Sequence, residues 1–302
     1  MYDRIIRKYV SEKGREMSKV RIVSDSTCDL SPELKEKYDI KVIPLCIVMD
    51  DQSYFDMVDV TPEEIFNWAD KNKTTPKTAA AGIEDAMNFL RPFKEAGEDV
   101  IYIGISEDMS TTCNVLRLAA AELEYDRVFV INSMNLSTGI GLQVLRAADM
   151  AAQGKTAEEI AEAISDARTL VRASFVVDNL TYLARGGRCT SATALLANTL
   201  QLKPCIEVKM GKMGVGQKYR GKYSKAIIKY AKDLEEKLLR ADKTRVFVTH
   251  TDMDQTIVED VKEYLKSLNY FDEIIETVAG GVISSHCGRG TLGVLFYDTQ
   301  EE

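Results

Sequence analysis

The chain contains 302 residues, of which 45% are hydrophobic and 28% are charged. This is the composition of an ordinary soluble globular protein, and the length suggests two domains with large cores. The formal charge of −8 at pH 7 argues against nonspecific binding to nucleic acid and against more than transient contact with a membrane surface.

Strands and helices are expected to alternate through the first half of the chain. Residues 1–16 form a charged N-terminal extension, after which a short buried strand is expected from Val20. Ser31 and Pro32 show the pattern of a helix N-cap followed by proline at the first helical position. Residues 40–49, IKVIPLCIVM, are expected to form one further strand.

Two capping boxes mark helices in this half. Thr61 with Glu64, and Thr156 with Glu159, each place a hydroxyl cap three residues before a glutamate. The second box opens an amphipathic helix expected to reach about residue 172. Between the two boxes, the polar sequence KNKTTPKTAAAG (residues 71–82) is expected to be a loop. Strands separated by such helices predict a doubly wound parallel-sheet α/β domain over residues 17–170.

Residues 100–114, VIYIGISEDMSTTCN, join a buried strand to a helix. Ser110, Thr111 and Thr112 come just before the helical run, where the first backbone amides are unpaired and the helix dipole favours negative charge. This stretch is therefore a candidate anion site at the carboxyl end of a sheet strand. The alternative is that one hydroxyl only caps the helix.

The second half of the chain changes to an α+β pattern. Gly211, Gly214 and Gly216 mark a hairpin with a strand on each side. Helices are expected over about residues 224–239 and 255–268, among strands at residues 174–178, 244–250, 273–279 and 292–298. We therefore expect a second α+β domain with antiparallel strands over residues 171–302.

The cysteines and histidines limit the redox and metal chemistry of the chain. The two histidines, His250 and His286, stand in no cluster with metal-ligand spacing, so no metal and no cofactor are predicted. The cysteines are widely spaced, form no Cys-x-x-Cys pair and suggest reduced thiols in a cytoplasm: Cys28, Cys46, Cys113, Cys189, Cys205 and Cys287. No signal peptide and no apolar run near about 18 residues is recognisable.

Several sequence islands stand out along the chain, in this order: SDSTCDL near the start, IPL, TPKT, the STT around Ser110, LTYLARGGR, LKPCIEV, KYRGKYSKA and SHCGRG. Taken together and in order, they resemble the DegV family. The resemblance extends over nearly everything from Val20 to Asp298. It implies two α/β domains that bury one fatty acid, in a binding subunit whose ligand is phosphorylated by a separate, dihydroxyacetone-kinase-like fatty-acid kinase.

The resemblance also implies a set of site residues. Thr78 and Ser110 match the residues that hold the carboxylate, and His286 matches one near the head group. Arg188 matches the arginine that supports the complex with the kinase. Three departures from the family pattern are Ala79-Ala80-Ala81 after Thr78, threonine instead of glycine after Ser110, and Cys-Gly-Arg-Gly instead of Thr-Gly-Pro-Gly after His286, which adds Arg289 beside the histidine. The remaining candidates are hydroxyls that support the helix start and basic groups near the head group: Thr111, Thr112, Arg220 and Arg289.

Each candidate also has a plainer interpretation. Thr78 fits a helix cap, Arg188 a solvated loop charge, and His286 a hydrogen-bonded structural histidine. Their occurrence together in the family order favours the site. Six apolar residues could line a tail cavity, although ordinary core is the favoured interpretation of each: Ile101, Ile103, Leu116, Leu195, Leu196 and Leu200.

Two functional hypotheses follow. The first is a cytoplasmic lipid carrier, not an enzyme, that buries one long acyl chain and presents its carboxylate to a partner kinase for acyl-phosphate formation. The second is a serine-type acyl hydrolase or transferase with Ser110 as nucleophile and His286 as base, for which no orienting acid can be named. A nucleotide-binding sensor on the same fold is a weaker third hypothesis.

Overall fold

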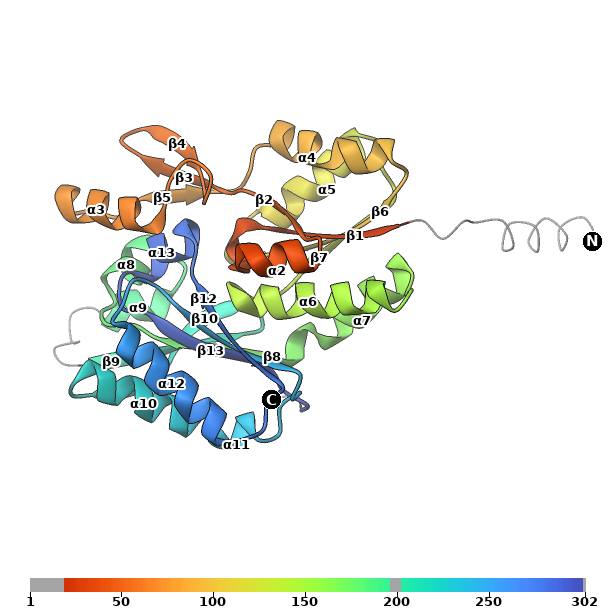
Figure 1. Cartoon of the computed structure of the whole chain (residues 1–302). Coiled ribbons are helices and arrows are strands. Elements are labelled where there is room, and N and C mark those ends of the chain that lie inside the picture. Colours follow the sequence, from red (N-terminus) through yellow and green to blue (C-terminus); the bar gives the residue numbers. More distant parts are fainter. Residues whose placement is uncertain (1–18, 196–201, 301–302) are drawn as a thin grey trace, which may run out of the picture.

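A four-stranded parallel sheet forms the centre of the first half of the protein (Figure 1). The computed structural model describes residues 19–195 and 202–300. The predicted extension at residues 1–16 therefore lies outside the described residues. The strand order is β2-β1-β6-β7 and all neighbours run parallel: β1 (Val20–Asp25), β2 (Lys41–Ile43), β6 (Asp99–Gly104) and β7 (Val128–Asn132).

Helices cover both faces of this sheet. Val100 and Tyr102 of β6 join one hydrophobic cluster, and Ile101 and Ile103 join another, because successive side chains of a strand point to opposite faces. The predicted doubly wound arrangement is confirmed. The helices are, on one face, α4 (Ile83–Glu95) and α5 (Thr112–Glu122), and on the other, α6 (Thr138–Ala152) and α7 (Ala157–Ala167).

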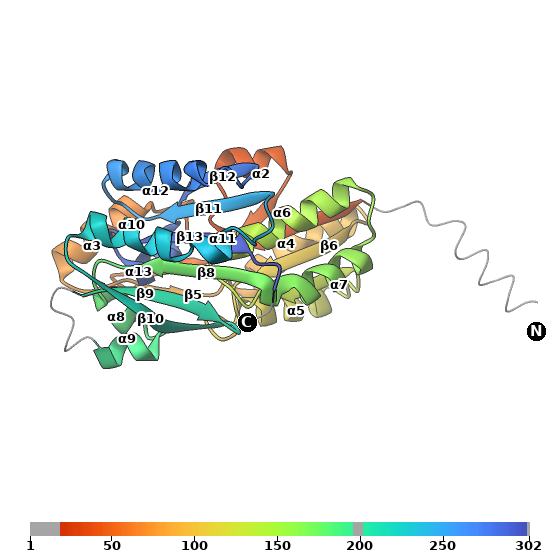
Figure 2. The same ribbon diagram turned by 90° about the horizontal axis from the view of Figure 1, so that it is seen from below.

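The second half is built on a six-stranded sheet with the order β10-β9-β8-β13-β11-β12 (Figure 2). Its neighbours are antiparallel except β11 and β12, which confirms the predicted α+β character and the hairpin. Helices α10 (Tyr223–Asp233) and α12 (Gln255–Ser267) pack on one face. The strands are β8 (Val171–Val176), β9 (Leu202–Lys209), β10 (Lys212–Arg220), β11 (Arg245–His250), β12 (Glu273–Val278) and β13 (Leu292–Tyr297).

Helix α6 lies between the two sheets. It contacts β1 and β6 on one side and β8 and β13 on the other. Leu142 and Leu145 of α6 belong to the same hydrophobic cluster as Ile103 of β6 and Phe175 of β8. We propose a domain boundary at residues 170 and 171, because every strand of the parallel sheet precedes it and every strand of the six-stranded sheet follows it.

A small antiparallel sheet from the first half lies beside helix α13 of the second half (Figure 1). The prediction of one strand over residues 40–49 is wrong, because the chain divides at Pro44, which has no N–H to give to a strand ladder. The loop predicted over residues 71–82 contains a strand. The elements are β3 (Cys46–Met49), β4 (Gln52–Phe55), α3 (Pro62–Asn72), β5 (Lys77–Ala79) and α13 (Gly281–Cys287), with the sheet order β4-β3-β5.

The predicted helix starts are confirmed, while two helix ends differ. Ser31, Thr61 and Thr156 each accept a hydrogen bond from a backbone N–H, and both capping boxes form. The helix opened by Thr156 ends at Ala167 rather than near residue 172, because the turn η2 (Arg168–Leu170) leads into β8. The helix expected over residues 224–239 breaks at Leu234. The remaining short elements are η1 (Ser26–Cys28), α2 (Pro32–Lys37), α8 (Thr181–Gly186), α9 (Thr190–Leu195) and α11 (Glu235–Leu238).

Within residues 19–195 and 202–300, no helix combines the length and the apolar character needed to cross a membrane. All six cysteines carry free thiols, and every one except Cys46 is buried.

Candidate functional site

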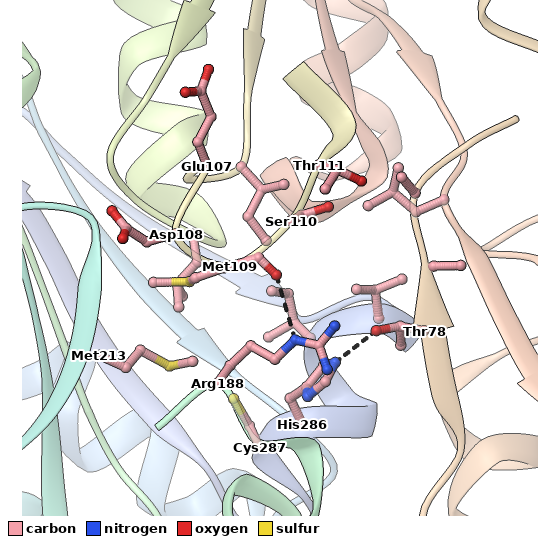
Figure 3. A pocket seen from close by; sticks show the side chains of 17 residues that line it. Thr78, Glu107, Asp108, Met109, Ser110, Thr111, Arg188, Met213, His286 and Cys287 are labelled. Carbon is pink, nitrogen blue, oxygen red and sulfur yellow. Dashed lines mark hydrogen bonds between the residues drawn. The ribbon is translucent and has the colours of Figure 1, made fainter. Parts of the chain in front are cut away.

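A cavity of about 480 Å³ lies where segments of both halves meet (Figure 3). This volume falls within the roughly 300–1,000 Å³ typical of small-molecule sites. The loop between β6 and α5 forms one wall, and β5, β10 and α13 contribute others. The apolar lining comes from Leu45, Ala79, Ala80, Ile105, Met109, Leu136, Met213, Val282, Ile283 and Cys287.

The hydroxyl cluster at the start of α5 faces this cavity. Ser110 Oγ lies 2.8 Å from Thr112 Oγ1 and accepts a hydrogen bond from the Thr112 backbone N–H at 3.3 Å. Thr111 occupies the N-cap position, yet its side chain makes no capping bond. Ser110 and Thr111 line the cavity, whereas Thr112 is fully buried beneath them. The cluster therefore offers hydroxyls to the cavity, with Thr112 fixing the position of Ser110.

Thr78 and His286 meet at another part of the cavity lining. Thr78 belongs to β5, where it pairs with Ile47 of β3, so it is a strand residue and not the helix cap considered from the sequence. His286 lies on α13, and its Nε2 is 2.8 Å from Thr78 Oγ1 (Figure 3). This contact joins two side chains that are 208 residues apart in the chain.

The imidazole of His286 is neutral at neutral pH. Burial lowers the pKa of His286 to about 4, and the positive charge of Arg188 lowers it further in the same direction. Its Nδ1 atom is buried and has no hydrogen-bond partner among the described residues. His286 therefore acts at this site through Nε2 and its contact with Thr78.

Gly186, the last residue of α8, explains how the imidazole fits so closely against the chain. A Cβ atom on Gly186 would collide with His286 Nδ1. We expect Gly186→Ala to push the imidazole ring away from Thr78. Binding of the fatty acid that the family resemblance implies should weaken about tenfold, since a loss of about 1.4 kcal/mol in binding free energy is a factor of ten in affinity. Binding titrations check this, with Gly214→Ala as the control, because a Cβ there meets nothing within 4 Å. Equal affinities for the two variants would contradict the expected role.

Arg188 lies at the rim of the cavity with its guanidinium beside the imidazole (Figure 3). Its Nε donates to the Met109 carbonyl at 3.4 Å and its Nη1 to the Gly186 carbonyl at 2.8 Å. Neither partner carries a charge, so these hydrogen bonds orient the guanidinium without neutralising it. The site thus presents one positive charge close to the hydroxyls.

The acidic residues at the rim are already matched by cations. Glu107 pairs with Arg117 at 2.6 Å, and Asp108 pairs with Lys212 at 3.5 Å. All four side chains are substantially exposed, so each pair is weak, but both carboxylates have a counter-charge nearby. They do not cancel the charge of Arg188.

Two of the predicted basic residues lie away from the cavity lining. Arg220 is exposed at the end of β10. Arg289 packs its guanidinium 4.6 Å from the centre of the Phe66 ring and forms ion pairs with Asp70 and Asp252. The structure therefore gathers Thr78, Ser110, Thr111, Arg188 and His286, and leaves Arg220 and Arg289 outside.

The apolar residues considered as possible tail lining are ordinary core in the part that the structure describes, which is the interpretation favoured from the sequence. Ile101, Ile103 and Leu116 have no exposed surface and do not line the cavity. Leu195 packs against the core shared by both sheets. Leu196 and Leu200 lie outside the described residues. The apolar wall consists of residues that sequence reasoning missed, because they come from the ends of separate elements and share no sequence periodicity.

The arrangement does not form the dyad that the hydrolase hypothesis requires. Among the described residues, His286 Nε2 contacts the Thr78 hydroxyl, and the Ser110 hydroxyl contacts that of Thr112. A nucleophile and its base need a mutual hydrogen bond, and the low pKa of His286 makes it a poor base. Among the described residues, no group of three or more His, Cys, Asp or Glu side chains is placed to hold a metal ion.

The two sheets and the cavity between their segments define an α/β protein built around a small-molecule-sized pocket. Residues 19–299 match the family model described as uncharacterised protein, DegV family, and the chain belongs to the DegV family. A DegV domain-containing protein of Clostridium perfringens is 32% identical over 281 residues, which cover 93% of this chain and 99% of that protein.

Two further relatives carry names that describe a ligand. A protein of Thermotoga maritima named fatty acid-binding protein is 32% identical over 281 residues, covering 91% of this chain and 96% of its own. A solved structure from Thermus thermophilus, described as fatty acid binding of a DegV family protein, is similar with a TM-score of 0.84 at 29% identity. The similarity covers 93% of this chain and 99% of that one. The family and fold predicted from the sequence are confirmed.

Proposed function

We propose that this protein binds one long-chain fatty acid, with the tail among the apolar residues of the cavity and the carboxylate beside Thr78, Ser110 and Arg188. The observation that carries the proposal is the convergence of hydroxyls and the Arg188 guanidinium, which forms no ion pair among the described residues, on a mostly apolar cavity of about 480 Å³. The fatty-acid binding described for two of the relatives supports it.

The tail supplies most of the affinity in this proposal. Each buried methylene is worth roughly 0.8 kcal/mol, so about fifteen methylenes give on the order of 12 kcal/mol before the costs of immobilisation. Leu45, Ile105, Leu136, Met213 and Val282 offer the apolar surface that this burial requires. The methionine side chains adapt to irregular shapes and suit a flexible chain.

The head group receives its hydrogen bonds from a prearranged set. With the proton on Nε2, the neutral imidazole of His286 donates to Thr78 Oγ1, which leaves the hydroxyl proton of Thr78 free to point at the carboxylate. Ser110 supplies a second hydroxyl and Arg188 a charge. A carboxylate that leaves water needs such donors in return.

We extend the proposal to presentation of the carboxylate to a partner, a dihydroxyacetone-kinase-like fatty-acid kinase that transfers the γ-phosphoryl group of ATP to it. The chain itself catalyses nothing in this scheme and needs no cofactor. Arg188 is exposed at the rim, where it is accessible to both the head group and a docked protein. We also propose a cytoplasmic location, since free and mostly buried thiols suit a reducing compartment.

Native mass spectrometry of protein purified from bacteria tests the main proposal. We expect a co-bound mass of one fatty acid, and uptake of one oleate by the delipidated protein.

Thr78→Val with Ser110→Ala removes both hydroxyls and is expected to weaken oleate binding about a hundredfold, at roughly 1–1.5 kcal/mol per hydrogen bond. Delipidated protein that takes up no fatty acid would refute the proposal. Turnover of an activated ester that is lost in Ser110→Ala would instead favour the hydrolase.

A further inference from the structure

A buried polar segment lies outside the cavity lining. It forms hydrogen bonds with four segments that do line the cavity. The segment is Asp25–Asp29, which runs from the last residue of β1 through the turn η1, and Asp56 is hydrogen-bonded to Ser26 within it. We call Asp25, Ser26, Asp29 and Asp56 the buried aspartate centre; none is exposed by more than 9%.

The first two bonded segments are the β6–α5 loop and the start of β3. Asp25 Oδ2 accepts from the Ile105 backbone N–H at 3.0 Å and from the Tyr102 hydroxyl at 2.7 Å. Ser26 Oγ accepts from the Leu45 backbone N–H at 3.2 Å. Ile105 and Leu45 both line the cavity, so these bonds fix the backbone directly behind two apolar wall residues.

The third segment is the start of α6, and the fourth is α13. Asp29 Oδ2 accepts from the Ser137 hydroxyl, next to the cavity residue Leu136, and Asp29 Oδ1 accepts from the Gly280 backbone N–H at 2.8 Å. Asp56 Oδ1 accepts from the Gly281 N–H at 2.8 Å. These two carboxyl groups accept hydrogen bonds from backbone amides at the start of the helix that carries His286, where the first amides have no partner within the helix.

The glycines at the start of α13 allow this approach. A Cβ atom on Gly281 would stand 2.7 Å from both Asp56 Oδ1 and Ile47 Cδ1 and 2.6 Å from Ile65 Cδ1. Only an unsubstituted backbone therefore lets the Asp56 carboxylate reach the helix start. Gly280 and Gly281, through their hydrogen bonds to Asp29 and Asp56, attach α13 to the first half of the chain.

We infer that the buried aspartate centre is the positioning device of the pocket: it holds Leu45, Ile105, Leu136 and α13 in the arrangement that brings Thr78, Ser110 and His286 together. This inference deepens the proposed function and rests on it. Buried carboxylates are costly unless their oxygens receive hydrogen bonds. Here the donors come from four wall segments, so the cost is offset only when those segments are in place.

Asp56→Ala is the variant that tests the inference. It removes the acceptor from Gly281 N–H, and we expect faster amide hydrogen exchange in α13 of the delipidated protein and about tenfold weaker oleate binding. Asp56→Asn keeps an acceptor for Gly281 and an amide that donates to Ser26 Oγ, so it is expected to restore both measurements to within about threefold of the wild type.

The control is Asp254→Ala, because Asp254 caps α12 through the Thr256 backbone N–H and α12 lines no part of this cavity. We expect unchanged exchange in α13 and unchanged oleate affinity. If Asp56→Ala fails to fold, Ser26→Ala is the substitute: it removes the acceptor from the Leu45 N–H and the donor to Asp56 Oδ2, leaves the Asp56–Gly281 bond, and must lower the affinity. Unchanged exchange and affinity in the folded variant would overturn the inference. Wild-type protein that takes up no oleate would refute the fatty-acid proposal, while the exchange of α13 would still test the positioning.

Discussion

Replacement of Arg188 by glutamate is expected to weaken oleate binding about a hundredfold, the equivalent of ~2.7 kcal/mol, because a charge-assisted hydrogen bond becomes a like-charge contact. The guanidinium lies at the cavity rim, and among the described residues it donates hydrogen bonds only to uncharged carbonyls. A bound carboxylate would therefore be its counter-ion. Calorimetric titration of delipidated protein measures the change.

A second measurement separates a direct charge effect from a structural one. The charge of Arg188 lowers the pKa of His286, although burial is the larger cause. In Arg188→Glu the pKa of His286, followed by the imidazole resonances, is therefore expected to rise from about 4 while staying below its ordinary value. Arg185→Glu makes the same charge change on the exposed part of α8 and serves as the control. Equal losses in the two variants would show that Arg188 has no special role.

The second large effect concerns the pH dependence of stability. Burial raises the pKa of Asp29 to about 8, and the charges of Asp56 and Asp25 act in the same direction. The unfolded chain releases this proton near an ordinary pKa of about 3.9, whereas the folded chain keeps it to about pH 8. The free energy of unfolding should therefore fall as the pH rises through this window, by up to about 1.4 kcal/mol per pH unit for this proton.

Asp29→Asn is expected to remove most of that slope, because the amide cannot ionise and still accepts from Gly280. Asparagine also tolerates the positive φ of 49° at this position. Urea unfolding at several pH values between 5 and 8 measures the slopes. Burial also raises the pKa values of Asp25 and Asp56, so a residual slope should remain. Asp254→Asn, at an exposed cap, should retain the wild-type slope, and an Asp29→Asn variant that also retains it would contradict the expectation.

Local sequence chemistry was enough to predict much of the fold. The capping boxes at Thr61 and Thr156 begin helices because their geometry depends on residues only three positions apart. The division of residues 40–49 into two strands could have been predicted from Pro44. The sheet to which β3 belongs, however, depends on its pairing with β5, about thirty residues further along the chain. Propensity alone does not reveal such distant pairings.

The site was predictable in part for the same reason. The hydroxyls at the start of α5 lie in one strand-to-helix turn, so their role at the cavity follows from local order. Helix α13, which carries His286, was missed because it has seven residues, begins with glycine and is held by tertiary hydrogen bonds. The family resemblance implied that His286 and Thr78 both lie near one head group, but the direct contact between them was not predicted.

The position of α6 has a consequence for how the molecule behaves as a whole. Cleavage of the chain between residues 170 and 171 would expose the apolar side chains of α6 that pack against the six-stranded sheet, since the helix packs against both sheets at once. Neither fragment would inherit a complete pocket, because Thr78 and Ser110 precede the cut and Arg188 and His286 follow it. Binding of the proposed fatty acid would therefore require both halves of the chain, and a ligand that binds only the intact fold adds RT ln(1 + [L]/Kd) to its free energy of unfolding.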